Sequence, residues 1–209
     1  DSKGTQIIEV VNDPTTTDTD LDGVVDALDN GTARGSDMDA AALLCTLLFM
    51  KLHLIAPSGS LPDPQVLANG DAWFKKQGIE VKNLACGNRQ FQRFAGTDQE
   101  RLDEINQLAN LSPDHVAMSL RGGYGLSRLL DRIDWQGIAK QVKQGLKIVG
   151  HSDFTAFNLG LFAKTGAPSF AGPMFSYDFC GDVSELTWKH FQEAMTQSSI
   201  EIEVVGPQV

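Results

Sequence analysis

The sequence contains few cysteines, and they do not form a recognisable pattern. Its three cysteines are Cys45, Cys86 and Cys180, and no C-x-x-C pair occurs. An odd number of widely separated cysteines does not fit a disulfide framework, and no histidine or second cysteine stands at ligand spacing from any of them. We therefore expect buried free thiols in a reducing compartment rather than disulfides, a metal site or a catalytic thiol.

Basic clusters and long hydrophobic runs are absent as well. The 209 residues include 17 Lys and Arg against 27 Asp and Glu, which gives a formal net charge of -10. Because no stretch is strongly basic, we expect neither nucleic acid nor an anionic membrane as a partner. The apolar stretch at residues 40–50 is shorter than the ~20 residues that span a bilayer. Asp37 and Asp39 precede it, where a signal peptide would carry positive charge.

The acidic residues are concentrated at the beginning of the chain. Residues 1–49 hold ten acidic and two basic residues and are rich in Thr, Asp and Gly. We expect this segment to be poorly ordered, or to form a small separate module, and to pack little against the remainder of the chain. Because Met50 and Lys51 begin the next domain as a natural start would, a non-native extension is a second interpretation of residues 1–49.

One motif in this acidic segment has the spacing of a calcium-binding loop. The pattern D-x-D-x-D-G is that of an EF-hand-like loop, with Gly23 at the sharp turn and an aspartate at the last ligand position in place of the usual glutamate. The candidate calcium ligands are Asp18, Asp20, Asp22, Asp26 and Asp29. The motif occurs once and has no obvious helical partner, so a solvated acidic tail is the alternative interpretation.

From residue 50 onward, short apolar runs rich in β-branched residues alternate with segments of helical periodicity. The expected strands are residues 51–56, 79–84, 115–120, 146–150, 168–171 and 200–205. The expected helices are residues 65–77, 97–110, 124–133, 135–143, 152–164 and 183–196. This alternation predicts an α/β fold with a mostly parallel sheet and helices on both faces, a Rossmann-like arrangement.

A serine occupies the turn between a predicted strand and a predicted helix. The stretch 146–156 runs from a β-branched pair through Gly150 to Ser152, where helical periodicity begins. Such a turn lifts a hydroxyl clear of the sheet and points it at the amino end of the helix, where free N–H groups favour an oxyanion. It resembles the nucleophile elbow of serine hydrolases, although Phe154 stands where G-x-S-x-G has its second glycine. The alternative is that Ser152 only caps the helix.

A second predicted strand leads into a turn that is rich in glycine. Residues 121–125 are Arg-Gly-Gly-Tyr-Gly, and glycines allow close backbone approach and expose N–H donors. The segment matches neither a phosphate-binding G-x-x-x-x-G-K-[ST] loop nor a dinucleotide fingerprint. In a parallel sheet this turn and the Ser152 turn open at the same carboxyl edge, where α/β proteins bind ligands.

Five landmarks follow one another in a recognisable order. They are Leu-Ile-Ala-Pro-Ser-Gly at 54–59, Arg-Phe-Ala-Gly-Thr at 93–97 with Glu-Arg-Leu at 100–102, the glycine turn at 121–125 with Arg-Leu-Leu-Asp at 128–131, Gly-His-Ser-Asp-Phe-Thr at 150–155, and Gly-Pro-Met at 172–174. Together they resemble the LD-carboxypeptidase (muramoyltetrapeptide carboxypeptidase) family of serine peptidases. The resemblance extends from about Met50 to Val209 and covers the N-terminal domain of that family.

The resemblance implies roles for residues at both turns. It makes Ser152 the nucleophile and the N–H groups of Asp153 and Gly123 the oxyanion hole. The residues implied in substrate binding are Arg121, Gly122 and Tyr124. It also implies catalysis without a metal cofactor, a location in the cytoplasm and a homodimer, with a murein peptide as the substrate.

No residue in the sequence stands out as the general base that a serine nucleophile needs. Of the four histidines, His53 falls within a strand and His190 late in a helix. His115 begins a strand at the opposite edge from the turns, and His151 adjoins the serine on a turn, where neighbouring side chains usually point apart. The family places its catalytic glutamate and histidine in a C-terminal domain. Because the chain stops at Val209, we expect it to carry half an active site.

The resemblance therefore implies a serine carboxypeptidase that releases the terminal D-alanine from murein tetrapeptide during peptidoglycan recycling, and that is inactive as this chain alone. One alternative is the immunity-type branch of the same family, which cleaves toxic aminoacyl-nucleotide conjugates. A second alternative, from a different class, is a non-catalytic calcium-binding module whose function lies in residues 1–49. The intact serine and glycine turns argue against that alternative.

Overall fold

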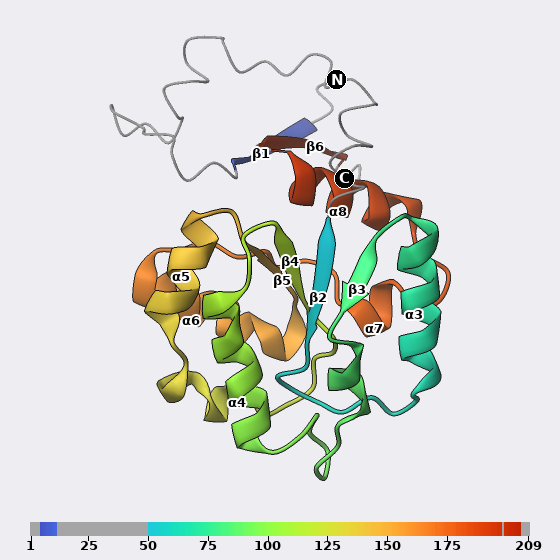
Figure 1. Cartoon of the computed structure of the whole chain (residues 1–209). Coiled ribbons are helices and arrows are strands. Elements are labelled where there is room, and N and C mark those ends of the chain that lie inside the picture. The colour runs from blue at the N-terminus through green and yellow to red at the C-terminus, as the bar shows by residue number, and fades with distance from the viewer. Residues whose placement is uncertain (1–4, 12–49, 198, 206–209) are drawn as a thin grey trace. The chain divides into compact units, whose positions relative to one another are not determined.

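The computed structural model describes residues 5–11, 50–197 and 199–205 (Figure 1). The chain divides into two compact units, one of residues 47–191 and one of residues 1–46 together with 192–209. The aspartates of the predicted calcium loop lie outside the described residues, and so does most of the acidic segment. In the described part of the chain, no helix is long and apolar enough to cross a membrane.

A four-stranded parallel sheet lies at the centre of the first unit. Its strands are β2 (Lys51–Ile55), β3 (Glu80–Lys82), β4 (His115–Ser119) and β5 (Lys147–Val149), in the order β3-β2-β4-β5. Phe170 adds a parallel bridge to Val149 beyond β5, so the strand expected at 168–171 is reduced to a single paired residue. The predicted α/β class with a parallel sheet is confirmed.

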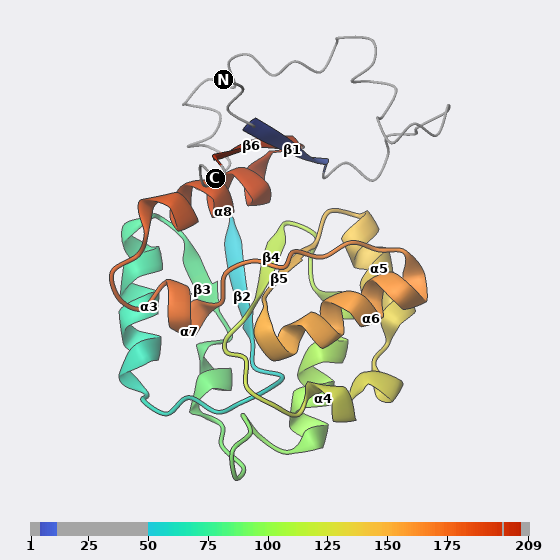
Figure 2. The same ribbon diagram turned by 180° about the vertical axis from the view of Figure 1, so that it is seen from behind.

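Helices cover both faces of this sheet. The helices of the described chain are α3 (Gln65–Lys76), α4 (Asp98–Gln107), α5 (Trp135–Lys143), α6 (Thr155–Thr165), α7 (Phe175–Asp178) and α8 (Glu185–Thr196). Ala117 and Ile148 pack into one core with apolar residues of α4, α5 and α6. The alternate strand residues Leu54 and Met118 are also fully buried, which requires cover on the opposite face. Figures 1 and 2 show α3 at one flank of the sheet and α5 and α6 at the other.

An aromatic cluster accompanies α3 and α7. Phe74 stacks on Phe175 with ring centroids 5.7 Å apart, and Phe179 lies 4.8 Å from Phe74. Gly70 makes this contact possible, because a methyl group in its place would lie 2.5 Å from the Phe175 ring. The cluster fixes α7, whose last residue is Asp178.

Helix α4 forms where a helix was predicted, but another predicted helix does not form. Thr97 begins α4 with a capping box in which its side chain and that of Glu100 satisfy each other's backbone N–H groups. The helix expected at 124–133 is instead two 3-10 turns, η3 (Leu126–Arg128) and η4 (Leu130–Arg132). Gly125, at the entry to η3, has a φ of 109°, so the first residues of the expected helix lie outside helical geometry.

The last predicted strand exists but does not belong to the parallel sheet. Strand β6 (Ser199–Val205) pairs antiparallel with β1 (Thr5–Val11) in a separate two-stranded sheet. Residues 5–11 thus form a strand within the segment that was expected to be poorly ordered or to form a small separate module. Both strands mix apolar with polar residues, as in Ser-Ile-Glu-Ile-Glu-Val-Val, which suits a sheet with one solvated face better than a parallel sheet buried on both.

The described cysteines are free thiols, as predicted. Cys86 is buried and Cys180 half-buried. Burial raises the pKa of the Cys86 thiol, and it raises the pKa of Cys180 to about 11. Thiols with raised pKa values are poor nucleophiles at neutral pH.

Candidate active site

Ser152 follows β5 at the carboxyl edge of the sheet in a strained backbone conformation. His151 is extended, and Ser152 then takes a φ of 61°, in the left-handed region that L-residues other than Gly, Asn and Asp rarely adopt. Such a conformation costs about 1–3 kcal/mol and persists only where the surrounding structure imposes it. A sharp turn of this kind, between a strand and a helix, is the geometry of a nucleophile elbow.

Contacts on both sides of the turn impose this conformation. Gly150 donates its N–H to the Phe170 carbonyl at 3.1 Å, and the buried Asn158 amide donates to the Gly150 carbonyl at 2.9 Å. Phe154 is fully buried and stacks on Phe157 with centroids 4.9 Å apart. A phenylalanine therefore replaces the second glycine of G-x-S-x-G because its ring is a core residue that anchors the start of the helix.

The Ser152 side chain does not cap the helix that follows it. The chain after β5 forms a 3-10 turn, η5 (Ser152–Phe154), which leads directly into α6, and neither element has a side-chain capping hydrogen bond. The Ser152 side chain is exposed at the protein surface. Its hydroxyl is therefore free to react with a ligand.

The glycine turn lies directly against Ser152. A methyl group built on Gly122 would lie 2.7 Å from Ser152 Oγ and 3.6 Å from the Asp153 nitrogen. Gly123 follows with a φ of 112°, which again favours glycine. The prediction that the serine and glycine turns open side by side at the carboxyl edge of one sheet is confirmed.

Three hydrogen bonds hold the glycine turn in place, and sequence reasoning missed all of them. Gly59 donates its N–H to the Gly122 carbonyl at 3.0 Å, and Arg121 Nη1 donates to the Ser60 carbonyl at 2.6 Å. On the other side, Asp153 Oδ2 accepts the Leu126 N–H at 3.1 Å. The Asp153 carboxylate thus ties the serine turn to the glycine turn, a role separate from that of its N–H.

A buried carboxylate supports the segment that carries Gly59. Glu104 is 4% exposed, and its Oε2 accepts the Ala56 N–H at 2.6 Å and lies 2.8 Å from Arg89 Nη2. Asn83 Nδ2 donates to the other oxygen at 2.7 Å. The fully buried Arg101 donates to the Pro57 carbonyl at 2.6 Å. Burial lowers the pKa of the Arg101 guanidinium, and the nearby Asp98 opposes that shift.

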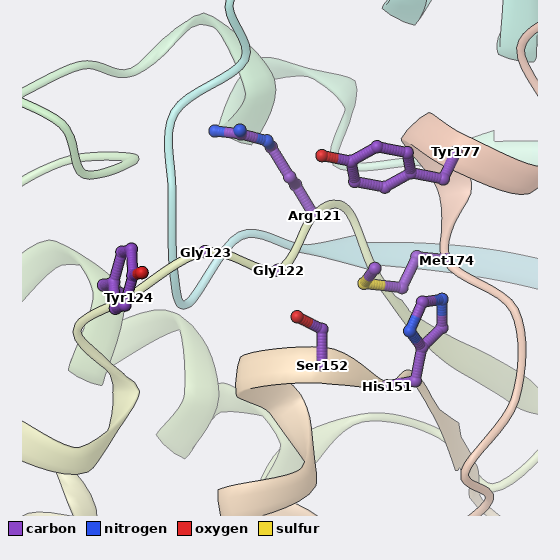
Figure 3. A pocket seen from close by; sticks show the side chains of 8 residues that line it. All are labelled: Arg121, Gly122, Gly123, Tyr124, His151, Ser152, Met174 and Tyr177. Carbon is purple, nitrogen blue, oxygen red and sulfur yellow. The ribbon is translucent and has the colours of Figure 1, made fainter.

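These elements enclose a cavity of about 570 Å³ (Figure 3). Its lining comes from the glycine turn, the serine turn and the segment that enters α7, and consists of Arg121, Gly122, Gly123, Tyr124, His151, Ser152, Met174 and Tyr177. Every candidate residue assigned to these turns lines the cavity except Asp153, whose backbone nitrogen faces the glycine turn. Sequence reasoning did not find Tyr177, because it is separated from the turns in sequence and only the packing of α7 brings it to the site.

The expectation for His151 is wrong. It was expected to point away from the adjacent serine, yet it lines the same cavity, and its side chain is 46% exposed. Its Nε2 lies 3.6 Å from Asp178 Oδ2, and the same oxygen accepts the Met174 N–H at 2.7 Å. The extended conformation of His151 followed by the left-handed Ser152 turns both side chains toward one opening.

Ser152 Oγ has no hydrogen-bonded base among the described residues. His115 begins β4 at the opposite edge of the sheet, as predicted, with its ring 6.3 Å from that of His53. Burial lowers the pKa of His53, and the neighbouring His115 adds to this effect. In the described part of the chain, no group of three His, Cys, Asp or Glu side chains could hold a metal ion. The calcium hypothesis for residues 18–29 lies outside that part and stays a prediction.

Comparisons with known proteins agree with this geometry. The model of the LD-carboxypeptidase N-terminal domain matches residues 52–172, more than half of the chain. A Bacillus subtilis protein named as a probable murein peptide carboxypeptidase is 30% identical over 146 residues, which are 69% of this chain and 44% of that protein. The microcin C7 self-immunity protein MccF of Escherichia coli is 32% identical over 132 residues, which are 61% of this chain and 37% of that protein.

A solved structure is also similar to this chain. The muramoyltetrapeptide carboxypeptidase from Oxalobacter formigenes has 42% sequence identity and a TM-score of 0.61, over 70% of this chain and 48% of that one. The matched part of this chain therefore spans less than half of the length of each of these relatives. With its strained serine beside a glycine turn, the chain belongs to the LD-carboxypeptidase family, and residues 52–172 correspond to the N-terminal domain of that family.

Proposed function

We propose that the chain contributes the nucleophile to a serine carboxypeptidase that releases the terminal D-alanine from murein tetrapeptide. The bond cleaved joins a diaminopimelate or lysine residue to D-alanine. The observation that carries this proposal is the strained, exposed Ser152, which lies in an open cavity against the unhindered backbone of Gly122. The relatives named as murein peptide and muramoyltetrapeptide carboxypeptidases support the substrate class.

The chemistry follows from the placement of these groups. Ser152 Oγ attacks the scissile carbonyl carbon and passes its proton to a general base. The N–H groups of Asp153 and Gly123 stabilise the negative charge that develops on the carbonyl oxygen. Collapse of the tetrahedral intermediate breaks the C–N bond, D-alanine leaves with a proton, and water then hydrolyses the acyl-serine ester. The family resemblance assigns the base to a histidine, oriented by a glutamate, in a C-terminal domain.

Other features of the proposal come from the same resemblance. The reaction would need no metal cofactor, would take place in the cytoplasm during recycling of cell-wall peptides, and would be carried out by a homodimer. A calcium ion bound by residues 18–29 would serve a separate role.

A second candidate function is cleavage of aminoacyl-nucleotide conjugates. MccF, a relative of this chain, has been solved with aspartyl sulfamoyl adenosine, at 25% identity and a TM-score of 0.63. The observation that favours this function is the exposure of Tyr124 and Tyr177, at 70% and 65%, on the lining of the cavity. Exposed aromatic rings can stack on a nucleobase.

The test measures D-alanine release from murein tetrapeptide by two proteins. One is the 209-residue chain, and the other is a fusion in which the C-terminal domain of the O. formigenes enzyme follows it. We expect release by the fusion, and none by the same fusion with Ser152→Ala. The chain alone should show no measurable release, because a triad without its base keeps only about 10³–10⁴ of its acceleration over water.

Two results would contradict the proposal. One is a folded fusion that leaves murein tetrapeptide intact but cleaves an aminoacyl-nucleotide conjugate, which would favour the second candidate. The other is release that continues after Ser152→Ala. Release by the chain alone that depends on Ser152 would mean that a described residue supplies the base, and His151 would be the first to test.

A further inference from the structure

The ionisable side chains that line the cavity are unbalanced in charge. Arg121 and His151 line it, together with two tyrosines, and no aspartate or glutamate is among the lining residues. The backbone N–H groups of the two turns add further donors at the same place. A cavity lined by cationic and N–H groups favours an anionic ligand.

The two basic side chains are not equally available to a ligand. Arg121 Nη1 already donates to the Ser60 carbonyl at 2.6 Å, and Figure 3 shows its guanidinium pointing away from Ser152. The imidazole of His151 stands beside Ser152 in the same view, with one ring nitrogen on the serine side. His151 is therefore the basic group nearest to the reacting bond.

Asp178 lies beside the other ring nitrogen of His151. Asp178 Oδ2 lies 3.6 Å from His151 Nε2 and is itself held by the Met174 N–H at 2.7 Å. The pairing engages Nε2, while Nδ1 makes no hydrogen bond with a described residue and can donate to a ligand.

The position of the oxyanion donors determines how the scissile carbonyl group is oriented beside Ser152. The donors lie on the glycine-turn side of Ser152, so the scissile carbonyl oxygen points there. His151 lies on a different side of Ser152 in Figure 3, on one of the two sides left for the leaving residue and the acyl part of the substrate. In a terminal amino acid, the carboxylate carbon is two bonds from the scissile nitrogen, so this carboxylate lies within a side-chain length of the nucleophile.

We propose that His151, positioned by Asp178, binds the free carboxylate of the substrate's terminal residue and so restricts the site to carboxypeptidase substrates. This inference rests on the proposed function, because it assigns the leaving residue of that reaction to the His151 side of Ser152. His151 is a binding residue here, and Asp178 is a positioning residue.

The experiment measures binding by titration calorimetry in the full 209-residue chain carrying Ser152→Ala, which prevents turnover. The ligands are murein tetrapeptide with a free terminal carboxylate and the same peptide as its C-terminal amide. A hydrogen bond to a charged group predicts that the free acid binds about tenfold or more tightly than the amide. His151→Gln should remove this preference, because the affinity for the free acid falls to about that for the amide.

Two further variants make the test specific. His115→Gln removes a histidine that is also paired with an aspartate, at the opposite edge of the sheet, and should keep the full preference. Asp178→Asn keeps an oxygen for the Met174 N–H but removes the charge, and should reduce the preference without changing amide affinity. A purely structural role for Asp178 would lower both affinities together.

The outcomes separate this inference from the proposed function. Equal binding of acid and amide would overturn carboxylate recognition and leave the carboxypeptidase proposal standing. A preference that survives His151→Gln but is lost in Arg121→Gln would assign the carboxylate to Arg121 and overturn the inference. A folded chain that binds neither peptide would contradict the inference and the proposed substrate together.

Discussion

The two edges of the parallel sheet carry similar ionisable groups but differ in backbone geometry. Each edge has a histidine near an aspartate, His151 with Asp178 at the carboxyl edge and His115 with Asp114 at the amino edge. At the amino edge, Asp114 also pairs with Lys51 at 2.8 Å, and hydrogen bonding to Lys51 lowers the pKa of Asp114. Asp114 is thus paired with Lys51 and His115, which are the first residues of β2 and β4.

The carboxyl edge combines its charges with strain and open backbone. Ser152 and Gly123 both have positive φ angles, and both line the same cavity. The difference teaches that a histidine–aspartate pair does not by itself mark a site. What distinguishes the carboxyl edge is a strained hydroxyl beside backbone N–H groups that have no side chain in front of them.

The largest expected effect concerns the carboxylates that support each edge. Glu104→Ala would leave the Ala56 N–H, the Asn83 amide and Arg89 without their buried partner, so we expect a loss of about 3–5 kcal/mol in the free energy of unfolding. Asp114→Ala removes an exposed ion pair at the amino edge and should cost less than about 1 kcal/mol. Urea unfolding measures both, and equal losses would contradict the comparison.

The next effect concerns the open backbone beside Ser152. Gly122→Ala would place a methyl group 2.7 Å from Ser152 Oγ, and displacing a nucleophile by this much should lower D-alanine release by the fusion protein about 10²-fold. Gly181→Ala is the matched control, because a methyl group there meets nothing within 4 Å. The thermal unfolding of both variants checks that they fold. Unchanged release by Gly122→Ala would show that the glycine turn is not close to the reacting atoms.

The smallest expected effect is the pH response of the amino edge. Burial lowers the folded-state pKa of His53 below 6.5, so below pH 6.5 the unfolded chain binds more protons than the folded chain. Stability is therefore lost as the pH falls from 6.5 through the folded pKa. His53→Gln should remove this loss, and His115→Gln should reduce it by removing the neighbouring charge. Unfolding titrations at several pH values test this, and a slope that His53→Gln leaves unchanged would refute it.

Much of the fold and part of the site could be predicted from local signals. The strand before Ser152, the stop of α6 at Gly166 and the capping box at Thr97 depend on neighbouring residues, and all three are present. The Asp153–Leu126 hydrogen bond, the Glu104 network and the entry of Tyr177 into the cavity were not predictable. They join segments that are far apart in the chain, and no local pattern encodes them.

The sequence by itself determined the α/β class, the two turns and the family, because β-branched runs, glycines and a serine at a strand end act over a few residues. Only the tertiary structure decided that β6 pairs with β1 rather than with the parallel sheet. It also decided that the segment after the glycine turn forms two 3-10 turns and that His151 shares a cavity with Ser152. The physical reason is that strand pairing and side-chain direction depend on partners distant in sequence, whose positions are set when the core packs.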